Sequence, residues 1–76
     1  MGTTTPIGAK MERAGFAWGE QMGREAEAFY RADDKGMAYA TLTGLVKGLE
    51  GCQDADYIRG VIAGCAEGIA EEVQVA

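Results

Sequence analysis

Glycines recur at intervals of four residues in three separate parts of the chain, and this spacing restricts the possible folds more than any other feature. They are Gly15, Gly19 and Gly23, then Gly44 and Gly48, then Gly60, Gly64 and Gly68. Residues four apart lie on one face of an α-helix, so each group would form a row. Each glycine inside a helix costs about 1 kcal/mol relative to alanine. Such rows let two helix backbones approach closely, so we expect glycine-lined helix contacts; the alternative is a glycine-rich composition with loosely packed helices.

Apolar residues recur at helical spacing in three segments, and no segment alternates as a strand does. The stripe of the first segment, about 60° wide, consists of Ile7, Met11, Trp18, Met22 and Phe29. The later stripes consist of Ala38, Leu42, Leu45 and Leu49, and of Ile58, Ile62, Cys65, Ile69 and Val73. We predict helices over about 6–31, 35–50 and 54–72. The fold expected for residues 1–76 is a single all-α domain, a small three-helix bundle or a helical hairpin with a long N-terminal helix.

The residues at the expected helix ends have the chemistry that such ends require. Pro6 stands at the favoured first helical position, and Gly51 stands where a left-handed residue would end the second helix. The predicted N-caps are Thr5, either Asp33 or Asp34, and Asp54.

Charge and size limit the classes of partner. The net charge is −5, and lysines and arginines do not cluster, so we expect no direct binding to nucleic acid or to an anionic membrane. A basic protein surface is the better match. A chain of 76 residues has a small core, so help from an oligomer or a bound partner is expected.

The sequence also bears on the compartment. The N-terminal residues lack the pattern of a secretory signal, and the most apolar stretch, 57–70, contains Arg59 and Glu67 and is short for a membrane span. Cys52 and Cys65 lie too far apart on the expected helices for a disulfide, which fits a reducing compartment. We therefore expect a cytoplasmic protein.

No pattern of catalytic residues stands out. The chain contains no histidine, the commonest general base near neutral pH and the commonest metal ligand. Asp33 with Asp34, and Asp54 with Asp56, stand at helix starts, where capping explains them better than acid–base chemistry or Mg²⁺ binding. We expect no enzyme activity, no metal and no cofactor.

Three features favour binding to a partner. Acidic residues are concentrated in 36–76, which has a net charge of −4, whereas 1–35 has a net charge of −1. Glu67, Glu71 and Glu72 crowd the last turns of the third helix, where a partner's Arg or Lys would relieve the repulsion; a frayed, solvated helix end is the alternative. Phe16 and Tyr30 project away from the apolar stripe of the first helix, either toward an interface or toward a second packing neighbour. The predicted partner-binding residues are Phe16, Tyr30, Glu50, Asp54, Asp56, Glu67, Glu71 and Glu72.

In size, acidity, helical content and lack of catalytic motifs, the whole chain resembles small phage-encoded inhibitors of bacterial defence, anti-CRISPR proteins among them. The resemblance implies an inhibitor or adaptor that occludes the basic nucleic-acid-binding surface of a larger protein or nucleoprotein complex. Two alternatives remain open. One is an oligomeric helical bundle that binds a metabolite or nucleotide, and the other is a homo-oligomeric assembly protein.

Overall fold

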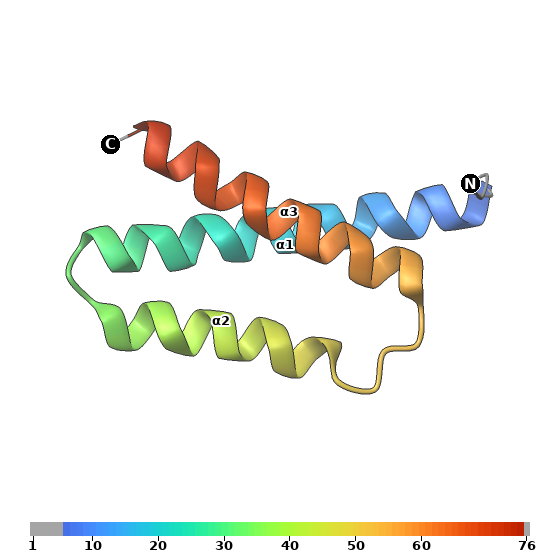
Figure 1. Ribbon diagram of the computed structural model, residues 1–76, viewed down its shortest axis with the longest axis horizontal. Coiled ribbons are helices and arrows are strands. Elements are labelled where there is room, and N and C mark those ends of the chain that lie inside the picture. The colour runs from blue at the N-terminus through green and yellow to red at the C-terminus, as the bar shows by residue number, and fades with distance from the viewer. Residues whose placement is uncertain (1–5, 76) are drawn as a thin grey trace.

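The computed structural model describes residues 6–75, which form three α-helices. They are α1 (Pro6–Arg31), α2 (Lys35–Leu49) and α3 (Ala55–Val75). Helices α1 and α2 run antiparallel as a hairpin, and α3 crosses over α1 (Figure 1). No strand occurs among the described residues, so the predicted all-α class and long N-terminal helix are confirmed. The third helix continues to Val75, beyond the end expected at residue 72.

The ends of the helices follow their local chemistry. The Asp34 carboxylate caps α2 by accepting a hydrogen bond from the Met37 N–H at 3.0 Å. Neighbouring Asp33 has a left-handed backbone, with φ at 62°, and forms the turn instead. Asp54 caps α3, and Gly51 has the positive φ, 80°, expected after α2. The predicted cap Thr5 lies outside the described residues.

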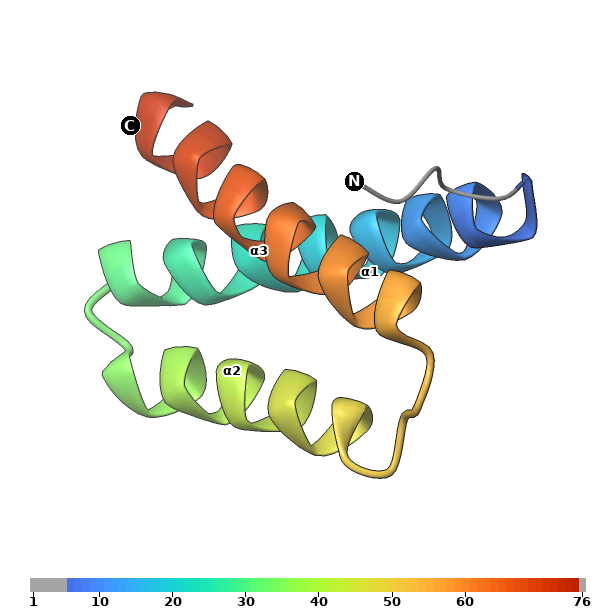
Figure 2. The ribbon, with the colours of Figure 1, turned by 45° about the vertical axis from the view of Figure 1, so that its right-hand side comes forward.

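The crossing of α1 and α3 is made by glycines. Gly15, Gly19 and Gly23 of α1 lie against the backbone of α3, and Gly60, Gly64 and Gly68 lie against the backbone of α1. A Cβ added at any of these positions would come closer than 3.0 Å to a backbone atom of the opposite helix. The two backbones touch along a line of interlocked glycines where α3 passes over α1 (Figure 2). The glycine-lined contact is thus observed, with α1 and α3 as its two helices.

The buried face of α1 differs from the predicted stripe. Its buried residues are Gly8, Gly15, Gly19, Gly23 and Ala26. At 100° per residue this row lies roughly 75° around the helix from the stripe of large residues. Ile7, a member of that stripe, is 76% exposed, and the others are half-buried. The reason is that α3 docks by backbone contact, which only the glycine row permits, so the large side chains flank the contact.

The large side chains of the stripe help to join α1 to α2 and α3. The Trp18 ring stacks on the Tyr57 ring of α3, with centroids 6.4 Å apart. On its α2 side, a Cβ added at Gly48 would lie 2.7 Å from the Trp18 ring. Gly48 of α2 therefore makes room for an aromatic ring, whereas the buried glycines of α3 make room for the backbone of α1.

The buried side chains of this fold are small. Val61 is the large side chain that is fully buried, and Ala26, Ala38 and Leu45 complete the buried apolar set. Large apolar side chains remain exposed at Ile7, Tyr30, Met37, Tyr39, Leu42, Val46, Ile62, Val73 and Val75. Folding of the single chain therefore leaves a considerable apolar surface in contact with water.

Candidate functional site

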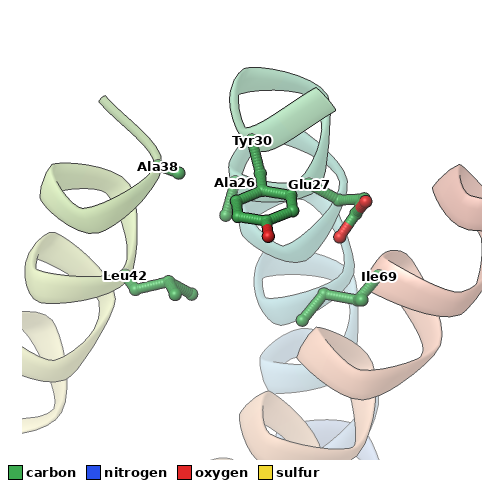
Figure 3. A pocket seen from close by; sticks show the side chains of 6 residues that line it. All are labelled: Ala26, Glu27, Tyr30, Ala38, Leu42 and Ile69. Carbon is green, nitrogen blue, oxygen red and sulfur yellow. The ribbon is translucent and has the colours of Figure 1, made fainter. Parts of the chain in front are cut away.

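The three helices meet around an open hollow of about 230 Å³ on the side where α2 and α3 diverge. It is lined by Ala26, Glu27, Tyr30, Ala38, Leu42 and Ile69, and we call it the Tyr30 hollow. Leu42 of α2 and Ile69 of α3 point toward each other across it, with Tyr30 of α1 on the third side (Figure 3). Its walls are apolar except for the Glu27 carboxylate and the Tyr30 hydroxyl.

Tyr30 has the properties of a binding anchor. Its side chain is 57% exposed although it lies beside two apolar side chains. A phenol combines a large apolar ring with a hydroxyl group, and such residues often dominate protein interfaces. The hollow is smaller than the roughly 300–1,000 Å³ of typical small-molecule pockets and has few polar groups to orient a ligand. Its size and lining suit an inserted apolar side chain better than a metabolite.

A second apolar surface lies on the outward side of α2. Tyr39, Leu42, Thr43 and Val46 surround a shallow hollow of about 350 Å³. Tyr39 is 74% exposed and Val46 is 58% exposed. Leu42 lines both hollows, so the apolar surface continues from the outer side of α2 to the Tyr30 hollow.

The acidic residues near the end of α3 are engaged within the chain. The Glu71 carboxylate accepts a hydrogen bond from Arg24 Nε at 2.8 Å, and Arg24 Nη2 forms an ion pair with the same carboxylate at 2.6 Å. Glu72 forms an ion pair with Arg31. Both arginines belong to α1, so the repulsion expected among the last acids of α3 is relieved by the first helix. A partner's arginine is not required at Glu71 or Glu72.

Glu20 lies beside Arg24 and Glu71, and the three side chains form a charged cluster in which the pKa values of the two carboxyl groups shift. Arg24 Nη2 lies 3.1 Å from Glu20 as well as 2.6 Å from Glu71. The hydrogen bond shared with Glu71 and partial loss of water raise the pKa of Glu20. The same hydrogen bond, together with Arg24, lowers the pKa of Glu71. The cluster fastens α1 to α3 beyond the glycine contact.

The other predicted partner-binding residues are dispersed. Asp54 is a helix cap, and Asp56 forms an ion pair with Arg59 at 3.0 Å. Glu50 is exposed at the C-cap of α2, Glu67 is exposed on α3, and Phe16 is half-buried, with its backbone against α3. Of the two predicted aromatic residues, Tyr30 is the one that lines a hollow. The predicted residues therefore do not form a single surface.

Sequence reasoning missed the apolar side chains that define the site. The sequence pattern places Leu42 and Ile69 in the stripes that pack the helices together, and it assigns no role to Tyr39 and Val46. A signal was present, because the apolar residues of 35–50 span an arc wider than one buried helix face needs. Counting that excess would have indicated an exposed apolar side.

Other kinds of site find little support among residues 6–75. No group of three or more Cys, Asp or Glu side chains there is placed to hold a metal ion. Cys52 and Cys65 are free thiols, and burial raises the pKa of Cys65. None of the described helices combines the length and apolarity that crossing a membrane requires.

Comparisons with known proteins identify no relative. No protein-family model, curated protein or solved structure matches the chain. The geometry of the two apolar hollows and the charges around them therefore provide the basis for inferring a function.

Proposed function

We propose that this protein works by binding another macromolecule, as an inhibitor or adaptor, rather than by catalysing a reaction. The Tyr30 hollow receives an apolar side chain of the partner. The observation that carries the proposal is the placement of large exposed apolar side chains around a hollow, on a chain whose buried residues are mostly glycine and alanine. An exposed apolar patch of this kind marks an interaction site on a small protein.

The charge around the hollow favours a basic partner. Glu27 lines the hollow, and the chain as a whole carries a net charge of −5. An apolar centre with a carboxylate at its edge matches a partner surface on which an apolar side chain stands beside a lysine or arginine. Long-range attraction between the acidic chain and such a surface would raise the association rate and make it sensitive to salt.

Within this proposal the target is a basic nucleic-acid-binding surface of a larger protein or nucleoprotein complex. Acidity, small size and the resemblance to phage-encoded inhibitors such as anti-CRISPR proteins support that choice. Blocking the surface sterically explains inhibition better than imitation of phosphate charge. Glu71 and Glu72 are paired with arginines of α1, and the remaining acids are scattered. A cytoplasmic location belongs to the same proposal.

Affinity capture of the tagged chain from lysate of its own host, at low and moderate salt, tests this function. Wild type and Ile7→Ser should both recover one basic complex, whereas Tyr30→Ala should not. Ile7 is a matched control because it is an exposed apolar residue at the opposite end of α1 from Tyr30. Unchanged recovery by Tyr30→Ala would show that the hollow is not the binding site.

A further inference from the structure

We propose that two copies of this chain dimerise through α2, with the two α2 helices antiparallel about a twofold axis. The surface concerned consists of Lys35, Tyr39, Leu42, Thr43 and Val46 of α2 together with its C-cap residue Glu50, and we call it the outer face of α2. At 100° per residue these residues lie within an arc of roughly 100°. The buried residues of α2, Ala38 and Leu45, lie beside this arc and pack on α1. The outer face is thus a separate side of the helix.

The middle of the outer face is apolar and concave. Tyr39 and Val46 are among the most exposed apolar side chains of the chain, and Leu42 is 38% exposed. Together with Thr43 they surround the shallow hollow of about 350 Å³. A tyrosine ring of a second copy is of the right size and chemistry to lie in such a hollow.

The ends of the outer face make it complementary to itself. Lys35 stands at its N-terminal end and Glu50 at its C-terminal end. With a twofold axis between Leu42 and Thr43, Lys35 meets Glu50 of the second copy, and Tyr39 meets Val46 of the second copy. Symmetry forms each contact twice. A parallel arrangement would instead place like charges together.

Among residues 6–75, neither Lys35 nor Glu50 is engaged by an ion pair. The ion pairs among residues 6–75 join Arg24, Arg31 and Arg59 to acidic side chains, and they leave Lys35 and Glu50 available. Antiparallel packing also sets the two helix dipoles in the favourable opposite sense. Charge, shape and exposure therefore favour the same occupant, a second copy of the chain.

Dimerisation through the outer face of α2 is separate from the proposed binding of a partner at the Tyr30 hollow and can be measured without that partner. Tyr30 and Ile69 lie outside the outer face, so the dimer would carry two Tyr30 hollows, with Leu42 at the edge of each. One helix face is smaller than the roughly 800 Å² per partner of a standard interface, so we expect a dissociation constant in the micromolar range or above. The self-association of the pure full chain measures it directly.

Sedimentation equilibrium from about 1 µM to about 1 mM covers that range. Wild type and Ile7→Ser should pass from the 8.0 kDa monomer to the dimer. The double variant Tyr39→Ser, Val46→Ser should raise the dissociation constant more than about a hundredfold, because its exposed apolar contacts are lost. Circular dichroism should show unchanged helix content in all of these proteins.

Charge reversal distinguishes the proposed antiparallel register from nonspecific hydrophobic association. Lys35→Glu or Glu50→Lys alone creates two like-charged pairs in the dimer and should weaken it about tenfold. An equimolar mixture of the two variants should restore wild-type affinity, since each like pair becomes an opposite pair. Both changes complement the dipole of α2, so unfolding of the helix does not account for weaker association.

Three results would overturn the proposal. The first is a wild-type chain that stays monomeric throughout the concentration range. The second is a dimer that survives Tyr39→Ser with Val46→Ser. The third is a mixture of the two charge-reversed variants that associates no more tightly than either variant alone.

Discussion

Glycines with the same sequence spacing have opposite roles in this chain, depending on what lies opposite each one. Gly19 lies against the backbone at Val61, and an added Cβ there would overlap backbone atoms that cannot move aside. Gly44 has no atom within 4 Å of the position that a Cβ would take. Gly19→Ala should therefore destabilise the fold by about 2 kcal/mol or more, since overpacking exceeds the gain in helix propensity. Gly44→Ala should stabilise it by about 0.5–1 kcal/mol.

Urea denaturation followed by circular dichroism measures both changes on one scale. The comparison is matched, because each variant adds one methyl group to a glycine inside a helix. A shift of both variants in the same direction would contradict the interlocked contact between α1 and α3.

Removing the charge of Glu20 should make the fold more stable. Its pKa is raised in the folded state because it shares a hydrogen bond with Glu71 and loses water. A carboxyl group with a raised folded-state pKa opposes folding when it is ionised. That unfavourable contribution is present at neutral pH and disappears as the pH falls through the raised pKa toward 4.5 and below. Glu20→Gln should therefore melt at a higher temperature than wild type near neutral pH, and the difference should vanish in acid.

Glu71 is the control for this measurement, because its pKa shifts in the opposite direction to that of Glu20. Its pKa is lowered by Glu20 and Arg24, so its ionised form stabilises the fold, and that contribution is lost as the pH falls through the lowered value. Glu71→Gln should lower the melting temperature near neutral pH. Melting curves of both variants near pH 7 and about pH 4 test the pair; equal shifts at the two pH values would contradict this titration.

At the scale of elements, Trp18 reports on the seam between α1 and α2. It is the only tryptophan in the sequence, and it lies between Tyr57 and the space above Gly48. In Gly48→Val the added side chain should push the ring off Tyr57 while leaving the glycine contact of α1 and α3 intact. Tryptophan emission should shift to longer wavelength and become more accessible to acrylamide. Gly44→Val, with open space around it, should leave the emission unchanged.

Local sequence determines where the helices begin and end, but it does not determine which helices pair. Helix ranges and caps could be predicted because Pro6, Asp34 and Asp54 act on backbone groups within a few residues of themselves. The pairing of glycine rows could not, because the row of α2 has the same spacing as the rows that actually meet. The candidate site had the same difficulty. Whether Leu42 is core or surface depends on how far α2 lies from α3, which no local pattern specifies.

In the whole molecule, the small size of the buried residues and the exposure of large apolar side chains have the same cause. Glycine contacts bring α1 and α3 together with little side-chain burial, so a single domain of this size gains only about 3–5 kcal/mol from its core. If dimerisation through the outer face of α2 covers part of the exposed surface, folding and association become linked. A protein held at about a hundred times its dissociation constant should gain about 2–3 kcal/mol of apparent stability.

The melting temperature of wild type should therefore rise with protein concentration, whereas that of the double variant Tyr39→Ser, Val46→Ser should not. Both side chains are exposed in the single chain, so the two proteins should melt alike when dilute and diverge as concentration rises. Thermal scans over a hundredfold range of concentration measure the divergence. Parallel curves for the two proteins would mean that the exposed side of α2 contributes nothing to stability through self-association. The surface would then be left for a different partner.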